Sequence, residues 1–178
     1  MSKYSKLIVF ILVLVLISAA IVLIDSSVDN INKSMPEISD AIVKADSDYN
    51  EAVDLVNNKD FEESMNKAVS AEENYNSSLD KLLDVQDKYS ADVNEVQKEY
   101  ISTVIQELEL KIQAVGKLKE SIECFEVYSN YTGTNYASEA NDLIYEATQY
   151  QNQRDAIVSD NPNLFNWILS NNEVSNEN

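Results

Sequence analysis

Residues 38–56 read ISDAIVKADSDYNEAVDLV, and their apolar residues recur at intervals of four and three. Such spacing lines one face of an α-helix, as in helices that pack against other helices. Neither glycine nor proline interrupts the stretch, so we expect one continuous helix. The residues predicted to be buried on its inner face are Ile38, Ile42, Ala45, Tyr49, Ala52 and Val56.

The flanking residues predict where this first helix begins and ends. Ser34-Met35-Pro36-Glu37 has the form of a capping box with proline in the first turn, where its missing N–H is not needed. Asn57-Asn58 predicts the end of the helix. Asp60, with Glu63 three residues later, can cap a second helix.

Residues 60–129 continue the helical pattern in two successive registers. As one helix they would form a rod about 105 Å long. Because such a rod needs a partner of equal length, we expect the chain to reverse near Ser90-Ala91-Asp92, with a continuous rod as the alternative. The first apolar row is Phe61, Met65, Ala68, Tyr75, Leu79, Leu82, Tyr89, Val93 and Val96, and the second is Ile101, Ile105, Leu108, Ile112, Val115 and Ile122.

The C-terminal part predicts one more long helix. Residues 130–135, NYTGTN, are interpreted as a loop because Gly133 can adopt a positive φ, and Asp160-Asn161-Pro162 predicts the end of the helix. We expect residues 163–170, NLFNWILS, to cover the open end of the bundle and the polar tail 171–178 to be disordered. The apolar row of this helix is Tyr136, Ala140, Leu143, Ala147, Tyr150 and Ile157, with Arg154 as a polar exception.

Two stretches resemble each other at a separation of 75 residues. Asp60-Phe61 and Asn135-Tyr136 each place an aromatic residue after a capping residue, and a tyrosine follows 14 residues later in both. Shared heptad spacing explains this likeness, and a duplicated two-helix hairpin is the alternative. The sequence predicts an all-α protein in which residues 36–170 form an antiparallel bundle of about four helices with coiled-coil-like packing.

An apolar segment precedes the predicted bundle. Residues 7–24, LIVFILVLVLISAAIVLI, contain one polar residue, and as a helix they extend about 27 Å, enough to cross a bilayer. Lys3 and Lys6 before the segment favour a cytoplasmic N-terminus. Cleavage after Ala20 is the alternative. The expected divisions are a cytoplasmic N-terminus (1–6), a transmembrane signal anchor (7–24), a juxtamembrane linker (25–35), the extracytoplasmic bundle (36–170) and the tail (171–178).

The composition excludes several classes of function. The chain has no histidine, one cysteine and two well-separated glycines, so it lacks an imidazole base, a thiolate metal cage and a phosphate-binding glycine loop. Its formal charge of −18 repels nucleic acid and anionic lipid headgroups. We therefore expect that the protein is not an enzyme, and that it has no cofactor, no metal site and no nucleic-acid partner.

Clustered carboxylates and ten tyrosines are the remaining candidates for chemistry. Asp46, Asp48 and Glu51 could bind calcium, as could Glu107 with Glu109, but no calcium-loop motif accompanies them. We interpret these groups as a solvated acidic face. The tyrosines on the predicted apolar rows are expected to pack in the core with their hydroxyls toward water, and they are Tyr49, Tyr75, Tyr89, Tyr136 and Tyr150.

A few other residues are candidates for contact with a ligand or partner. Tyr128 and Tyr131 lie beside the predicted loop and are the pair most suited to ligand contact. Leu164, Phe165 and Trp167 could dock on a partner or at the membrane interface instead of covering the bundle. Cys124 is expected to be a small buried residue, with an intermolecular disulfide as the alternative, and possible glycosylation sequons begin at Asn32, Asn76 and Asn130.

These features favour a structural or protein-interaction module of the cell envelope, anchored by one membrane span. Its expected partner is another envelope protein or a second copy of itself. The alternative is an extracytoplasmic bundle that holds a small ligand between its helices and signals through a separate partner. The six residues predicted to lie inside the cell provide no output domain, which favours the first interpretation.

Overall fold

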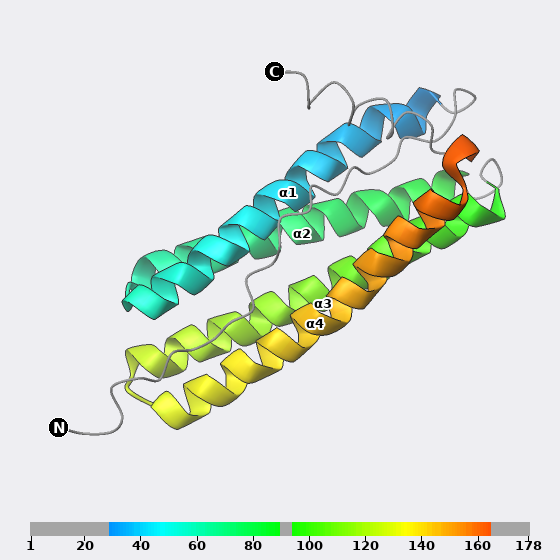
Figure 1. The fold of residues 1–178 in the computed structure, drawn as a ribbon. Helices are drawn as coiled ribbons and strands as arrows, with labels where there is room; N and C mark the ends of the chain where they lie inside the picture. The colour runs from blue at the N-terminus through cyan, green and yellow to red at the C-terminus, as the bar shows by residue number, and fades with distance from the viewer. Residues whose placement is uncertain (1–28, 90–93, 165–178) are drawn as a thin grey trace, which may run out of the picture.

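Four long helices make up most of the computed structural model, which describes residues 29–89 and 94–164 (Figure 1). Within these residues there is no β-strand, so the all-α prediction and the number of helices are confirmed. The predicted reversal between residues 60 and 129 is also confirmed, since two separate helices lie there. The helices are α1 (Asp29–Asn58), α2 (Phe61–Tyr89), α3 (Glu95–Glu126) and α4 (Asn130–Asp160), followed by the short 3-10 helix η1 (Pro162–Leu164).

No helix in residues 29–89 and 94–164 has an apolar stretch long enough to span a membrane. The predicted transmembrane segment at 7–24 and the predicted disordered tail at 171–178 lie outside the described residues.

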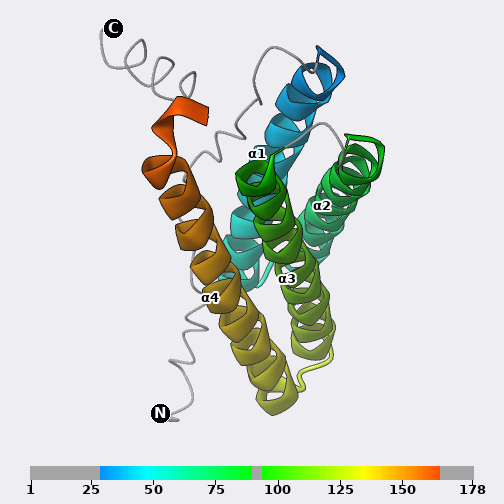
Figure 2. The same cartoon turned by 90° about the vertical axis from the view of Figure 1, so that its right-hand side faces the viewer.

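The helices pack mainly in two pairs, α1 with α2 and α3 with α4. α1 and α2 form one antiparallel hairpin, α3 and α4 form a second, and α2 and α3 join the two hairpins (Figures 1 and 2). α1 touches α3 at only a few points, and its contacts with α4 are fewer still. The bundle therefore consists of two hairpins held together chiefly along α2 and α3.

The inner face predicted for α1 is confirmed, because all six of its residues are buried. In α2 the buried row includes two serines and an alanine that the apolar pattern did not identify. Phe61, Met65 and Leu79 from the predicted row are half-buried against the core. The observed row of α2 is Ser64, Ala68, Ala71, Tyr75, Ser78, Leu82 and Val85, at regular heptad spacing.

Helix α3 has two buried rows because it lies between α2 and α4. The predicted row is confirmed, with Ile112 half-buried and its other five members buried. The second row was not predicted, because polar residues interrupt it. It consists of Gln97, Tyr100, Val104, Glu107, Lys111, Ala114, Leu118, Ser121 and Phe125, all buried.

Helix α1 begins earlier than the capping box predicts. It starts at Asp29 and continues through Pro36, so residues 29–35 of the predicted linker are helical. A proline inside a helix removes one backbone hydrogen bond but does not always end the helix. No other glycine or proline lies in residues 29–35 to stop the helix before that point.

The prediction of a loop at residues 130–135 is wrong. These residues form the first turns of α4, and Gly133 does not have a positive φ. A Cβ on Gly133 would lie 2.8 Å from Cε1 of Phe125, so glycine is needed here for close packing of α4 on α3. The positive φ of this turn belongs to Tyr128 instead.

The buried row of α4 also differs from the predicted one. Ala137, Ile144 and Gln151 are buried, whereas Tyr136, Leu143 and Tyr150, each one residue earlier, are half-buried. The predicted members Ala140, Ala147 and Ile157 are buried as expected, and so is Arg154. The predicted ends of α1 at Asn58 and of α4 at Asp160 are confirmed.

The two hairpins turn in the same way. Lys59 after α1 has a φ of 65° and Tyr128 after α3 has a φ of 60°. In each turn, this residue donates its N–H to the carbonyl three residues earlier, and the next residue donates to the carbonyl five residues earlier, which is a Schellman motif. The N···O distances are 3.0 Å for Lys59–Val56, 2.9 Å for Asp60–Leu55, 3.1 Å for Tyr128–Phe125 and 2.8 Å for Ser129–Cys124.

Each buried row of the first hairpin matches a buried row of the second hairpin 69 residues later in the chain. Lys59 and Tyr128 are also 69 residues apart. The sequence had suggested a separation of 75 residues. A serine joins the helices at the corresponding contact in both, from the second helix in the first hairpin and from the first helix in the second. Ser64 of α2 donates to the carbonyl of Ala52 in α1 at 2.7 Å, and Ser121 of α3 donates to the carbonyl of Gly133 in α4 at 2.8 Å. The protein is thus two hairpins of equivalent register.

The two glycines predict opposite effects of the same substitution. Gly133→Ala should lower the free energy of unfolding by about 1–3 kcal/mol, because the new methyl group would overlap the buried ring of Phe125. Gly116→Ala should raise it by about 0.5–1 kcal/mol, because no atom lies within 4 Å of the new Cβ and alanine favours the helix. Urea unfolding of the full chain, followed by circular dichroism, measures both. Equal effects of the two substitutions would contradict the packing of α4 on α3.

Candidate functional sites in the core and at the hairpin turn

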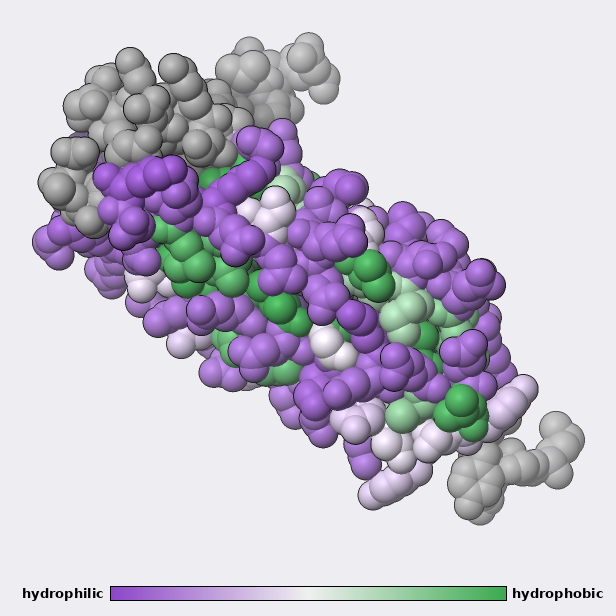
Figure 3. Space-filling model, turned by 180° about the vertical axis from the view of Figure 1, so that it is seen from behind, coloured by the Kyte–Doolittle hydropathy of each residue, from purple (hydrophilic) through white to green (hydrophobic). Residues whose placement is uncertain are grey.

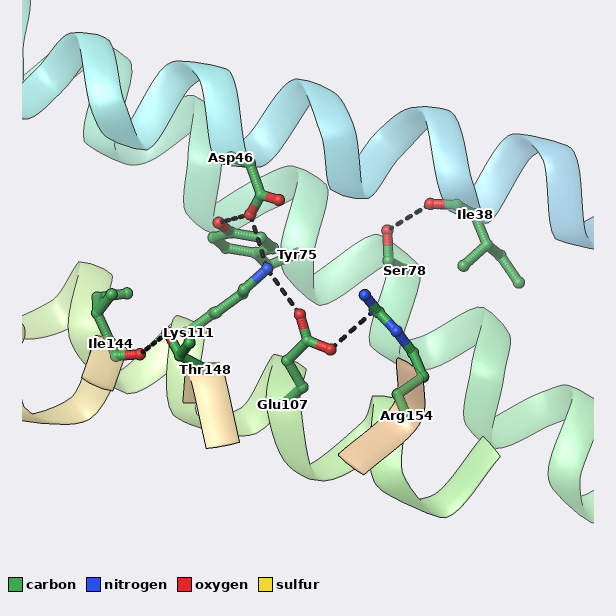
Figure 4. A network of polar contacts seen from close by, with 9 residues as sticks. All are labelled: Ile38, Asp46, Tyr75, Ser78, Glu107, Lys111, Ile144, Thr148 and Arg154. Carbon is green, nitrogen blue, oxygen red and sulfur yellow. Dashed lines mark hydrogen bonds and ion pairs between the residues drawn. The ribbon is translucent and has the colours of Figure 1, made fainter. Parts of the chain in front are cut away.

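A chain of five polar side chains crosses the bundle and joins all four helices (Figure 4). Lys111 of α3 lies at its middle, with Nζ 2.9 Å from Oδ1 of Asp46 in α1 and 2.9 Å from Oε1 of Glu107. Tyr75 of α2 donates its hydroxyl hydrogen to Oδ1 of Asp46. Arg154 of α4 donates from Nη1 to Oε2 of Glu107 at 2.9 Å.

The four charged side chains of this network are almost completely withdrawn from water. Their exposed fractions do not exceed 6%. Two carboxylates face two cations, so the network is neutral as a whole. Burying charges costs free energy that pairing roughly offsets, whereas a single unpaired charge is strongly destabilising. The network therefore adds little net stability, but any other packing of the helices that separates its charges would be strongly disfavoured.

The network favours the charged state of its cations and keeps its tyrosine protonated. Burial disfavours the ammonium of Lys111, but the carboxylates of Glu107 and Asp46 outweigh that effect and raise its pKa above the ordinary value. Burial raises the pKa of Tyr75 well above its ordinary value, and the Asp46 carboxylate raises it further. Both groups therefore remain hydrogen-bond donors at neutral pH.

The interpretation of the clustered carboxylates as a solvated face is wrong for three of them. Asp46 and Glu107 belong to the buried network, and Asp48 is also buried. Asp48 accepts a hydrogen bond from Ser70 at 2.7 Å and one from Lys67 at 3.3 Å. Glu51 and Glu109 are exposed, as expected. Among the described residues, no group of three or more acidic or sulfur side chains is arranged to hold a metal ion.

The tyrosines of the predicted rows divide into two groups. Tyr49 and Tyr75 are fully buried, so the expectation that their hydroxyls reach water is wrong. Tyr136 and Tyr150 are half-buried, and the side chain of Tyr89 lies outside the described part of the structure. The Tyr49 hydroxyl is buried without a hydrogen-bond partner among the described residues. A buried hydroxyl in that state costs about 1–3 kcal/mol.

The turn between α3 and α4 and the first turn of α4 carry the most exposed large hydrophobic side chains of the described residues. Val127, Tyr128 and Tyr131 are 71%, 88% and 82% exposed, and together we call them the aromatic turn. Seen from behind, the corresponding end of the molecule shows green and pale atoms among the hydrophilic ones (Figure 3). The structure thus brings together the two tyrosines that the sequence singled out. Tyr128 also has a positive φ, which bulky residues rarely adopt and which costs free energy.

The other candidate residues lie apart from one another. Leu164 is half-buried against the core, as expected for a residue covering the end of the bundle, and Phe165 and Trp167 lie outside the described residues. Cys124 is half-buried, so the expectation of full burial is wrong.

The three sequons occupy helices. Asn76 is exposed on α2, where its amide donates to the carbonyl of Glu72 at 2.9 Å. Asn130 is exposed at the first residue of α4. Asn32 lies in α1, and its side chain is outside the described part of the structure.

Sequence reasoning missed Lys111 and did not recognise Arg154 as a partner of Glu107. A signal was present, because Glu107 and Lys111 are four residues apart and lie on a heptad row with Tyr100, Val104 and Ala114. That row was not identified because it has charges where apolar residues were sought.

Comparisons with known proteins give no assignment for this chain. No protein-family model, no curated protein and no solved structure matches it significantly. Its function is therefore argued from its own residues.

Removal of the central cation should be strongly destabilising. Lys111→Met leaves the carboxylates of Asp46 and Glu107 buried without their shared ammonium, so the free energy of unfolding should fall by about 3–5 kcal/mol. Lys98→Met is the control, because the side chain of Lys98 is 40% exposed and pairs with the exposed Glu95, and its effect should stay within about 0.5 kcal/mol. Urea unfolding of both variants measures the difference. Similar losses would show that the network does not organise the core.

The two fully buried tyrosines of the first hairpin should respond oppositely to loss of the hydroxyl. Tyr49→Phe should raise the free energy of unfolding by about 1 kcal/mol, because it removes a buried polar group that has no partner in the described structure. Tyr75→Phe should lower it, because Asp46 loses a donor. Thermal unfolding compares the two. Destabilisation by Tyr49→Phe equal to that by Tyr75→Phe would mean that the Tyr49 hydroxyl has a partner.

Proposed function

We propose that this chain is a single-pass membrane protein whose extracytoplasmic helical bundle acts as a protein-interaction module of the cell envelope. The observation that carries the proposal is the aromatic turn, Val127, Tyr128 and Tyr131, which exposes three large side chains within five residues. Large apolar side chains gathered at one point of a surface mark a site of interaction with other molecules.

The proposed membrane anchor is the apolar segment at residues 7–24. Its length suits a bilayer, and Lys3 and Lys6 favour a cytoplasmic N-terminus. Residues 25–28 alone separate this segment from α1, so the bundle would stand close to the membrane surface. The acidic bundle would remain in water, because anionic headgroups repel it.

The rigidity of the bundle also supports an interaction module. Partner binding loses less free energy to ordering when the contact residues already sit on a fixed scaffold. The aromatic turn joins α3 and α4, which pack along their lengths and are joined by Arg154 to Glu107 and by Ser121 to Gly133. A ligand-binding bundle has less support, because paired charges and a tyrosine occupy the centre where an apolar ligand would lie.

Photocrosslinking in intact cells of the source organism tests the proposal. A photoreactive amino acid at Tyr131 should form a discrete adduct with another protein, because this position is exposed at the aromatic turn. The same amino acid at Asn76, exposed on the side of α2, is the matched control and should give at least fivefold less. Protease added to the cells should remove the bundle. A protected bundle would contradict the proposed orientation, and no adduct from position 131 would contradict the interaction module.

A further inference from the structure

We infer that the aromatic turn is the centre of a larger docking surface, formed by both hairpin turns, that binds a lysine- and arginine-rich protein surface carrying an apolar recess. This inference rests on the proposed function and specifies the chemistry of the partner. It starts from the position of the two turns, which lie at the same end of the molecule (Figure 1). Phe61 at the start of α2 stacks on Phe125 near the end of α3, with ring centroids 6.4 Å apart.

The end with the two turns is the end that would face away from the membrane. α1 runs from Asp29 to Asn58, so the first hairpin turn lies about 45 Å along the helix from Asp29, which is close to the proposed anchor. The aromatic turn lies at this same far end. We call it the distal end. A surface in this place can meet a partner across the envelope without hindrance from the bilayer.

The distal end is strongly acidic around its apolar centre. Five exposed carboxylates and one exposed lysine flank the two turns, and they are Asp60, Glu62, Glu63, Glu123 and Glu126 with Lys59. The next lysines along the helices do not neutralise this end, because each is already engaged with other carboxylates. Lys67 pairs with Asp48 and Glu51, Lys117 pairs with Glu120 and Glu139, and Lys119 pairs with Glu72.

An apolar centre with a charged rim is the usual arrangement of a protein-binding surface. Complementarity of charge then selects the partner. Nucleic acid and anionic lipid carry the same sign of charge as the rim. A second copy of the chain would present the same acidic end. A cationic protein surface satisfies the carboxylates, and an apolar recess on it accepts Tyr128 and Tyr131.

The test measures the adduct formed by the full chain with the photoreactive group at Tyr131, in intact cells. Glu123→Lys with Glu126→Lys should reduce its yield about tenfold or more, because the rim then repels a cationic partner. Asp80→Lys with Asp87→Lys changes the total charge by the same amount on exposed positions of α2 away from the distal end, and should leave the yield unchanged. Raising sodium chloride from about 0.05 M to 0.5 M should weaken adduct formation by the unaltered chain, since salt screens the attraction.

The outcomes separate this inference from the proposed function. A protein adduct that survives both the Glu123/Glu126 change and high salt would overturn the cationic partner while leaving the interaction module standing. An adduct with lipid, or with a second copy of this chain, would also overturn it. If the chain with its native Glu123 and Glu126 forms no adduct from position 131, both the proposed function and this inference are contradicted. The inference is supported if the crosslinked peptide of the partner is rich in lysine and arginine, and if charge reversal at Glu123 and Glu126 and high salt both lower the adduct yield.

Discussion

A single ammonium group, that of Lys111, is shared by carboxylates from two helices, and the network around it joins all four helices. The apolar rows alone specify the packing weakly, because much of α1 and α2 presents alanine and serine at the contact, as at Ala52 and Ser64. Rotation or sliding of one helix would leave Asp46, Glu107 or Arg154 buried without its partner. That penalty exceeds the contribution of any one small side chain to the packing.

The sequence predicted the fold class well because four stretches of regular apolar spacing contain almost no glycine or proline. All six residues predicted for the inner face of α1 are buried, since no polar side chain interrupts their row, but the buried Asp46 and Asp48 beside it were assigned to the surface. α3 was only half predicted, because its second row contains Glu107 and Lys111. In α4 half of the predicted row is buried and the other half lies one residue too early, as where Tyr136 was chosen over Ala137. Charges that pair inside a core cannot be told from surface charges until the partner helix is known.

The candidate sites were predictable to different degrees for a physical reason. Tyr128 and Tyr131 could be singled out because they belong to none of the predicted apolar rows, and both are exposed. The reason given for singling them out was wrong, since the nearby glycine serves the contact with Phe125 and not a turn. The equivalence of the two hairpins at 69 residues was hidden, because the corresponding positions match in burial and turn geometry but rarely in residue type, as with Tyr75 and Ile144. Similar backbones can thus be built from dissimilar residues.

The sequential packing of the helices sets the order in which the chain can fold. The main partner of each helix is a helix adjacent to it in the chain. Contacts within each hairpin are therefore local, and local contacts favour fast folding. The bond between Asp46 and Lys111 joins residues 65 positions apart, and during synthesis α1 and α2 are complete before Lys111 exists. Until then the carboxylate of Asp46 has the hydroxyl of Tyr75 as a donor but lacks its cation. The first hairpin therefore carries an uncompensated charge on its inner face until α3 packs against it.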